Sequence, residues 1–295
     1  MNVTNYLTRH ILRYDTIVAT VATVAAFLLP LQSVVAASKD ESGISVKLTP
    51  YVVGYVGSLP ITATLLTAWL TMIILVAIAY FAGRKRSLIP GKLQNLFEMV
   101  VGGMYDYMSD TLESKKLARK YFPVIATIFF FVLFMNWIGL FPGVTSIGFF
   151  EGTGDDAHFT PLLYPAATDL NITIGLAIVA FVVIEFAGIA ALGVWKYGGK
   201  FINFSGKTIG QRVLNFAIGL IELVSELARL VAFSFRLFGN IFAGKTLLVV
   251  IMALATPYVL PVPIIAYEIF VGFIQAFIFA ILTLFFIKIA ITEPH

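Results

Sequence analysis

The sequence contains one arginine in the middle of a long apolar stretch, and the chemistry of that residue needs explaining first. Arg236 lies within ELVSELARLVAFSFRLFGNIFAGK, residues 222–245, and mostly apolar residues continue to Ala255. An arginine at membrane depth costs about 2.5–3.5 kcal/mol on insertion scales. A long side chain can avoid part of this cost by reaching the headgroups, but roughly nineteen mostly apolar residues follow Arg236. We therefore expect the charge to have a function.

Other polar residues accompany this arginine at helical spacing. Four residues at intervals of 7, 7 and 4 share one side of a helix: Glu222, Arg229, Arg236 and Asn240. A stripe of structural polar residues facing a helix bundle is the alternative, but it does not explain a strong base at its centre. Arginine is always protonated in proteins, so Arg236 can act as a fixed positive charge but cannot relay a proton by releasing one.

The last apolar segment carries a second set of polar positions. Glu268, Gly272 and Gln275 fall at i, i+4 and i+7, which places them on one face of a helix. Ionisable groups in apolar surroundings need a partner or water. Glu268 is therefore a candidate carboxylate relay for protons.

The composition is that of a membrane protein. Hydrophobic residues make up 59% of the 295 residues and charged residues only 12%, against about a quarter charged in ordinary globular domains. Several apolar runs exceed 18 residues, which predicts an all-α polytopic membrane protein. The chain has no cysteine and three scattered histidines, so we predict no disulfide, no metal site and no cofactor. The net charge of +4 comes from bases between the apolar runs, which indicates orientation in a membrane and not binding to nucleic acid.

Residues 1–37 have the layout of a secretory signal peptide. Two arginines come first, an apolar stretch follows, and small residues end at Ala37. We predict cleavage before Ser38. The alternative is an uncleaved extra spanning helix, for which the run is just long enough. Residues 38–60 are expected to be an external N-terminal segment, and residues 61–295 a single membrane domain.

The membrane domain is predicted to contain about five spanning helices. Residues 90–120 are too polar to span and are predicted to form an interfacial amphipathic helix. Bases after the first and third spans mark the cytoplasmic side, so the N-terminus is expected outside and the C-terminus inside. The last two spans are unusually long, which requires tilt, and a break is expected near Glu226. The spans are expected at residues 61–82, 122–141, 166–195, 208–256 and 264–291.

Some polar positions in these spans allow both a structural and a functional interpretation. Asp169 and Asn171 could cap the third spanning helix or take part in proton access. Glu226 could be solvated at the interface or belong to a proton path. Glu185 is ionisable at membrane depth, and the sequence alone does not name its partner.

Two motifs in the last spans resemble a known family. SFRLFGNIFAGK, from Ser234, and QAFIF, from Gln275, are similar to the signatures of subunit a of F-type ATP synthases, the stator subunit that faces the rotating c-ring. PGKLQ at Pro90 and DLNIT at Asp169 match the same family. Weaker similarity extends from about Ile61 to the C-terminus.

The resemblance implies a role for each matching residue. Subunit a couples ion flow to c-ring rotation through two proton half-channels, and it binds no nucleotide. Arg236 would attract the essential carboxylate of each passing c-subunit and block a direct leak between the half-channels. Glu222 would relay protons on the cytoplasmic side, with Asn240 and Gln275 near the arginine. The last two helices would be steeply tilted along the c-ring. Further expected partners are the peripheral stalk, the lipid bilayer and, indirectly, the catalytic head.

Lys245 departs from the family pattern. Many members carry Glu or His at this position, with a reciprocal His or Glu at the position of Glu268. We expect Lys245 and Glu268 to lie on facing helices in the external half-channel and to interact, directly or through water. A lysine there raises or lowers proton access according to its own protonation state, so its role stays open.

Two other functions compete with this interpretation. A transporter of an anionic solute would use Arg236 to bind its substrate, but it predicts two matching halves with broken helices, and the sequence has no such repeat. A purely structural membrane anchor leaves Arg236, Glu268 and Gln275 unexplained. The signal-like N-terminus favours a bacterial plasma membrane over a mitochondrial inner membrane.

Overall fold

The computed structural model describes residues 49–84, 92–141, 143–151, 158–201, 208–254 and 261–292. The signal peptide predicted at residues 1–37 and the first part of the segment at 38–60 lie outside these residues. Cleavage before Ser38 therefore stays a prediction.

The described residues form seven α-helices and two short antiparallel hairpins. The helices are α2 (Ala63–Arg84), α3 (Lys92–Thr111), α4 (Lys115–Ile138), α5 (Leu170–Leu192), α6 (Val194–Phe201), α7 (Ile209–Leu254) and α8 (Pro261–Ile291). The strands are β1 (Val52–Val56), β2 (Leu59–Thr62), β3 (Gly148–Glu151) and β4 (His158–Pro161), and two 3-10 turns are η1 (Val144–Ser146) and η3 (Ala166–Thr168).

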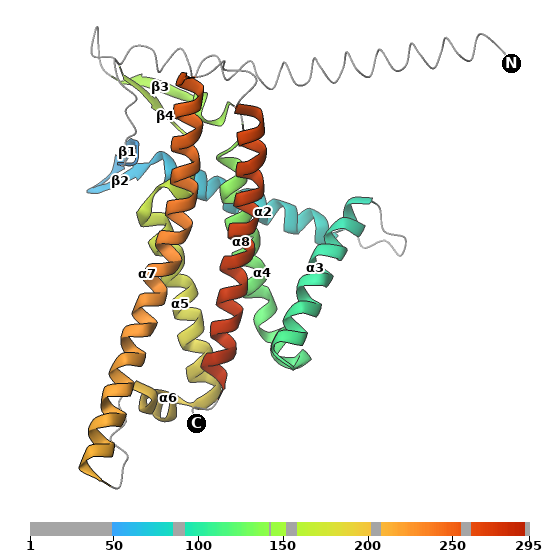
Figure 1. Ribbon diagram of the computed structural model, residues 1–295. Helices are drawn as coiled ribbons and strands as arrows, with labels where there is room; N and C mark the ends of the chain where they lie inside the picture. Colours follow the sequence, from blue (N-terminus) through green and yellow to red (C-terminus); the bar gives the residue numbers. More distant parts are fainter. Residues whose placement is uncertain are drawn as a thin grey trace, which may run out of the picture.

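The two longest helices, α7 and α8, set the axis of the bundle (Figure 1). They lie side by side, with α5 against α7 and α4 against α8, and α2 crosses behind them at a large angle. Both hairpins lie at the end where α7 finishes and α8 begins, which we call the hairpin end. α6 and the C-terminal end of α8 lie at the opposite end, which we call the α6 end.

Four of the described helices are long and apolar enough to cross a membrane: α2, α4, α5 and α8. The all-α polytopic prediction is therefore confirmed. α7 has 46 residues, a length of about 69 Å at 1.5 Å per residue. The break expected near Glu226 is wrong, because α7 is continuous from Ile209 to Leu254. The ion pairs of Glu226 described below neutralise its charge, so nothing at this position forces the helix to end.

The helix expected at residues 90–120 corresponds to α3, but it is shorter than predicted. α3 ends at Thr111, and the basic residues from Lys115 onward begin α4. Ser114 separates the two helices because its Oγ accepts a hydrogen bond from the backbone N–H of Leu117 at 3.4 Å and caps α4. The location of α3 in a membrane interface stays a prediction.

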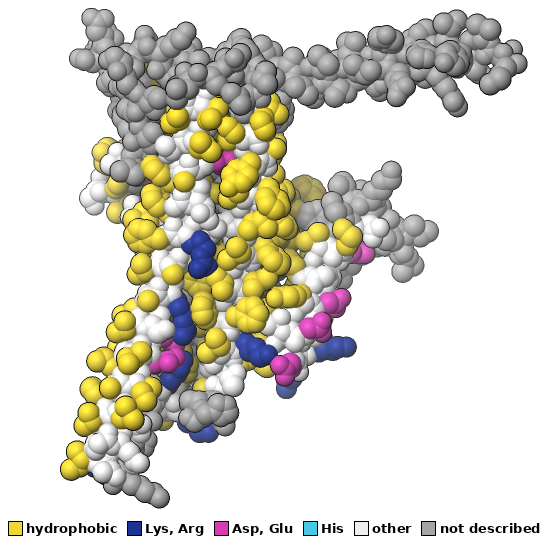
Figure 2. All heavy atoms as spheres, viewed as in Figure 1, with side chains coloured by type: hydrophobic (Ala, Val, Ile, Leu, Met, Phe, Trp, Pro, Cys, Tyr) yellow, Lys and Arg dark blue, Asp and Glu magenta, His cyan; other side chains and the backbone are white. Residues whose placement is uncertain are grey.

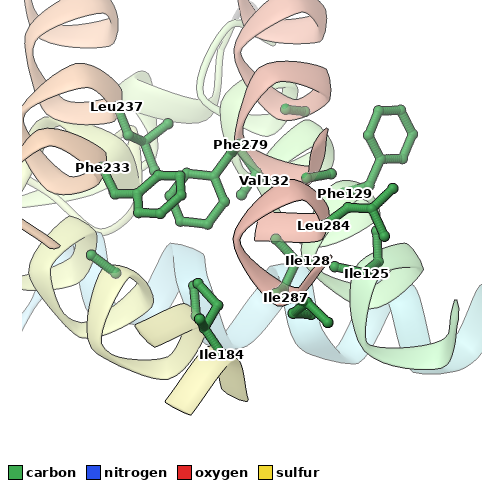
Figure 3. Packing of buried hydrophobic residues seen from close by; sticks show 14 of the residues in the cluster. Ile125, Ile128, Phe129, Val132, Ile184, Phe233, Leu237, Phe279, Leu284 and Ile287 are labelled. Carbon is green, nitrogen blue, oxygen red and sulfur yellow. The ribbon is translucent and has the colours of Figure 1, made fainter. Parts of the chain in front are cut away.

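The core lies where α4, α5, α7 and α8 meet (Figure 3). Phe233 of α7 packs against Phe279 of α8 with ring centroids 4.8 Å apart. Leu237, one turn beyond Phe233, is fully buried. α5 approaches closely because it buries a stripe of mostly small residues at helical spacing: Thr173, Ala177, Ala180, Ile184, Ala187 and Gly188. This packing decides which side of α7 faces inward.

Candidate functional site

Arg236 points away from the core. Because Phe233 and Leu237 face inward, the same helix directs Arg236 to its exposed outer side. The guanidinium makes no hydrogen bond or ion pair with any described residue. Val231 and Phe235 on this outer side are exposed as well, and Figure 2 shows hydrophobic side chains along much of this face. α7 thus presents a permanent positive charge on an apolar surface.

Asn240 joins α7 to α8 one turn beyond Arg236. Its Nδ2 donates a hydrogen bond to Oε1 of Gln275 at 2.7 Å. Gln275 is buried, and its Nε2 has no hydrogen-bond partner among the described residues. A buried donor without a partner costs about 1–3 kcal/mol, and such groups in folded proteins are normally satisfied by ordered water. The amide pair is therefore a suitable place for a bound water, and Asn240 lies one turn of α7 beyond Arg236.

Glu268 lies directly against the backbone of α7. The residue is 4% exposed, and its Oε1 has no partner among the described residues. The carboxylate contacts Gly244 so closely that a Cβ at this position would overlap with it. Gly244 in the sequence FAGK therefore leaves space for the carboxylate of Glu268 on the facing helix.

Lys245 turns toward aromatic rings and makes no ion pair or hydrogen bond with Glu268. Its Nζ lies 5.7 Å from the centroid of the Tyr164 ring, which is itself 5.3 Å from the ring of Tyr51. Burial and then the neighbouring Tyr51 raise the pKa of Tyr164 to about 12. The phenol therefore stays neutral, and its face can accept a cation. Lys245 and Glu268 lie on neighbouring helices, and an interaction through water stays a prediction.

Two residues of α4 hold α8 in register. Asn136 donates from Nδ2 to the carbonyl oxygen of Gly272 at 3.2 Å, and Trp137 donates from Nε1 to that of Ile269 at 3.1 Å. A Cβ at Gly272 would lie 3.2 Å from Cβ of Asn136, which is tighter than ordinary contact. The sequence analysis did not identify this contact. It fixes the face of α8 that carries Glu268.

Asp169 caps α5 at the hairpin end. Capping was one of the two roles that the sequence allowed for this residue, the other being proton access. Its Oδ1 accepts a hydrogen bond from the backbone N–H of Asn171 at 2.9 Å, and its Oδ2 accepts one from Oγ1 of Thr64 at 2.7 Å. Farther along α5, Thr173 and Ser234 have their hydroxyl oxygens 3.3 Å apart. These buried polar links join α2, α5 and α7, and a role for Asp169 in proton access stays a prediction.

Glu222 belongs to a separate group of charges at the α6 end. Nζ of Lys200 lies 2.8 Å from Oε1 of Glu222 and 3.1 Å from Oε1 of Glu226. Arg229 lies 3.5 Å from Glu226 and 3.9 Å from Glu222. Glu226 is only 2% exposed, so the expectation that it could be solvated at the interface is wrong. We call these four residues, together with Glu185 and Tyr197, the ion-pair cluster.

α6 brings Lys200 to this cluster through two glycine contacts. The ring of Tyr197 packs on Gly188 of α5, and the carbonyl oxygen of Phe201 packs on Gly219 of α7, so closely that a Cβ at either glycine would overlap. Burial tends to lower the pKa of Lys200, but Glu222 and Glu226 outweigh this and raise it above its ordinary value. Lys200 therefore stays charged.

The residues singled out from the sequence thus form two groups along α7, one of which includes residues of α8. Asn240, Lys245, Glu268 and Gln275 gather between α7 and α8 toward the hairpin end, whereas Glu222 joins the ion-pair cluster. Arg236 lies between the groups, 14 residues after Glu222 and 9 before Lys245, or about 21 Å and 14 Å along a helix. In the part of the chain that the structure describes, no group of three or more His, Asp or Glu side chains could hold a metal ion.

Comparison with known proteins finds a family match over most of the chain. Residues 65–288 match the family described as ATP synthase A chain. The chain is 41% identical over 214 residues to "ATP synthase subunit a" of Campylobacter jejuni subsp. jejuni serotype O:23/36 (strain 81-176), which covers 72% of this chain and 83% of that protein. It is 36% identical over 226 residues to the protein of the same name in Campylobacter concisus, covering 76% and 88%. The corresponding protein of Helicobacter hepaticus is 35% identical over 228 residues, covering 77% and 89%.

Proposed function

Because the chain belongs to the ATP synthase subunit a family, we propose that it is the stator that couples proton flow to rotation of a c-ring. It is a membrane-sector subunit of an ATP synthase, a multi-pass protein of a bacterial membrane, and not itself catalytic. The proposal has three parts: Arg236 faces the c-ring, one half-channel opens at the hairpin end, and the other opens at the α6 end.

The exposed side chain of Arg236 carries this proposal. A guanidinium on an apolar outer face costs about 2.5–3.5 kcal/mol in lipid. A carboxylate at 4 Å would return about 4 kcal/mol at an effective dielectric constant of 20. A partner that brings a carboxylate to this face is therefore the arrangement in which the residue is stable. A transporter of an anionic solute would instead need Arg236 to line an internal cavity, whereas its side chain lies on the exposed side of α7.

Unsatisfied and ionisable groups on both sides of Arg236 support two half-channels. Toward the hairpin end, Oε1 of Glu268 and Nε2 of Gln275 are buried polar atoms that can bind water. Toward the α6 end, Glu222 is the partly exposed member of the ion-pair cluster, with 33% of its side chain accessible. Protons would enter and leave through these groups and cross the gap at Arg236 only on the c-ring.

The helix arrangement supports steep tilt of the last two helices. α2 has 22 residues, about 33 Å, which matches a hydrocarbon core of about 30 Å when the helix stands upright. α7 and α8 cross α2 at a large angle (Figure 1), so an upright α2 leaves them strongly inclined. An inclined α7 of 46 residues would follow the surface of a ring over a long contact.

The charge distribution supports an external hairpin end and a cytoplasmic α6 end. Lys200, Arg229 and Lys288 lie in or near the α6 end, and Lys and Arg side chains gather toward that end in Figure 2. Bases favour the cytoplasmic side of a membrane protein. The C-terminus would then be cytoplasmic and the N-terminal segment external.

Substitution of Arg236 tests the proposal. Whole ATP synthase carrying Arg236→Ala, reconstituted in vesicles with a pH-sensitive dye, should lose ATP-driven pumping and show faster passive proton flux through the membrane sector. Arg236→Lys keeps a charge but loses the planar fork and the guaranteed protonation, so it should fail nearly as badly. Arg212→Ala is the matched control, because Arg212 is an exposed arginine near the start of the same helix. Pumping near the wild-type rate in either Arg236 variant would refute the proposal.

A further inference from the structure

α6 carries the most exposed large hydrophobic side chain among the residues that the structure describes. Trp195 is 93% exposed, and Val194 before it is exposed as well. Successive residues of a helix are about 100° apart, so Trp195 lies on nearly the opposite side of α6 from Tyr197. Tyr197 is buried against Gly188 of α5. α6 therefore has an inner face on the bundle and an outer face that carries the tryptophan.

The contacts of the inner face fix the direction of Trp195. The hydroxyl of Tyr197 donates a hydrogen bond to Oε2 of Glu185 on α5 at 3.0 Å. Nζ of Lys200 lies 2.8 Å from Oε1 of Glu222 on α7. Because α6 has only eight residues and is held by two neighbouring helices, it cannot rotate its outer face inward without breaking both contacts. Trp195 is therefore held toward the surroundings of the bundle.

The end of α5 places Trp195 at the boundary of the hydrocarbon core. α5 is one of the helices long and apolar enough to cross a membrane, and it ends at Leu192. Exposed apolar residues at helical spacing lead along α5 toward this end: Ile178, Val182 and Phe186. Gly193 adopts a φ of 81° and turns the chain into α6, so Trp195 comes three residues after the span. At this depth the lipid tails give way to the headgroups.

The chemistry of this segment fits phospholipid headgroups. Tryptophan is enriched at membrane–water interfaces, because its ring is apolar while its N–H needs a polar partner. Between Glu185 and Glu222 the sequence has four Lys or Arg residues and no Asp or Glu. Basic segments next to a span are attracted to anionic lipids. The side chain and the charge of its neighbourhood therefore favour the same partner.

We propose that α6 is an interfacial anchor, whose outer face inserts Trp195 among the phospholipid headgroups of the leaflet at the α6 end. The anchor goes beyond the proposed function, because it needs only that the chain crosses a membrane. The inner face of the same helix supplies Tyr197 and Lys200 to the ion-pair cluster. The bilayer surface thus holds α6 in place from outside, while α5 and α7 hold it from inside.

Photo-cross-linking in the whole ATP synthase identifies the neighbour of Trp195. Trp195→benzoylphenylalanine introduces a photoreactive ketone on a large aromatic side chain. After illumination in vesicles of phosphatidylglycerol and phosphatidylcholine, the mass of this subunit should increase by that of one phospholipid. Fragmentation of the adduct should place the new bond at the glycerol or at the first carbons of an acyl chain, because the ring lies where headgroups meet tails.

Phe186→benzoylphenylalanine is the matched control. Phe186 is exposed on α5, six residues before the helix ends and so about 9 Å along it. Its adducts should therefore form deeper in the acyl chains. Three results would each overturn the anchor: an adduct of position 195 with another polypeptide, an adduct as deep as that of position 186, or no adduct at 195 while 186 gives one.

Two simpler variants give a second measurement that does not depend on assembly of the photoreactive one. Trp195→Tyr keeps an interfacial aromatic ring with a polar group, so the amount of assembled complex in the membrane should match wild type. Trp195→Glu places a negative charge against anionic headgroups, so that amount should fall several-fold. Equal amounts of assembled complex in the two variants would also overturn the anchor.

Discussion

The contact between Glu268 and Gly244 allows a sharp test of the half-channel at the hairpin end. In Gly244→Ala, the new Cβ would overlap with Oε1 and the carboxyl carbon of Glu268 and would lie 2.7 Å from Oε2. Ordinary contact begins at 3.4 Å, so the whole carboxylate must move away from α7. The overlapping atoms are the end of a flexible side chain, which means that the side chain moves while the helices keep their positions.

The expected energies separate an effect on function from an effect on folding. An off-rotamer side chain costs about 0.5–1.5 kcal/mol, and replacing Gly by Ala inside a helix returns about 0.5–1 kcal/mol. The net change in stability is therefore small. A misplacement of about 1 Å at a site of proton transfer can cost about 100-fold in rate. We therefore expect Gly244→Ala to assemble normally and to lose between ten- and 100-fold of its ATP-driven pumping.

The assay compares assembly and pumping in the same reconstituted preparation. Gly210→Ala is the control, because Gly210 lies on the same helix and a Cβ there meets nothing within 4 Å. Adding Glu268→Asp to Gly244→Ala shortens the displaced side chain and should recover part of the rate, which neither single change predicts. Wild-type pumping by Gly244→Ala would show that the position of this carboxylate does not matter, and the reasoning would be wrong.

Two further predictions concern charge pairs. If Lys245 and Glu268 interact through water, Glu268→Gln should lower pumping without loss of assembly, and the exchange Lys245→Glu with Glu268→Lys should recover more activity than either single change; additive losses would mean that the two residues are uncoupled. The hydrogen bond from Lys288 and then its charge hold the pKa of Glu113 below its ordinary value. The pair links α8 to the turn before α4. Its contribution to stability is fully present above the pKa that Glu113 has in the unfolded chain, and it is lost as the pH falls through the lower pKa that Glu113 has in the folded protein. Melting temperatures of the purified complex should accordingly fall less on acidification in Glu113→Gln than in wild type, and equal pH profiles would contradict a stabilising pair.

Helical periodicity was sufficient to predict the contacts that depend on one or two helices. The intervals placed Asn240 on one face of α7 and Gln275 on one face of α8, while the family resemblance implied that both lie near the arginine; the two side chains form a hydrogen bond with each other. The length of the apolar runs, and not their periodicity, predicted the helices α2, α4, α5 and α8, which are long and apolar enough to span. The buried character of Leu237 next to the exposed Arg236 also follows from the periodicity of α7.

Contacts between segments that are distant in the sequence were not predictable from periodicity. Lys200 meets Glu226 only because α6 folds back onto α5 and α7, and the bond between Thr64 and Asp169 joins residues 105 positions apart. A lysine in a basic segment between two apolar runs indicates the cytoplasmic side of the membrane. Nothing in the neighbouring sequence indicates that this lysine also pairs with buried carboxylates. The glycines at positions 188 and 219 gave a signal that was not used, because small residues mark places of close helix approach.

The β1–β2 hairpin was missed although its turn has a local signature. Gly57 adopts a φ of 64°, and glycine is the residue that adopts this conformation without strain. Gly57 and Ser58 separate two runs of extended residues, which is the pattern of a two-residue hairpin turn. Reading the segment at 38–60 only by its polarity hid this pattern.

The continuity of α7 gives the proposed stator its barrier. Because α7 is one continuous helix, Arg236 lies about 21 Å along it from Glu222 and about 14 Å from Lys245, so neither group can reach across the arginine by a change of rotamer. A proton that passed directly along α7 would approach a permanent charge, and repulsion at 4 Å is about 4 kcal/mol at an effective dielectric constant of 20. That energy slows the direct path about a thousandfold. The same charge attracts an ionised carboxylate of the partner. Arg236 would therefore repel a free proton and favour the partner's carboxylate in its deprotonated form. In the proposed stator, one fixed charge would therefore serve both as the barrier and in the exchange, whereas a lysine, which can lose its proton, would guarantee neither.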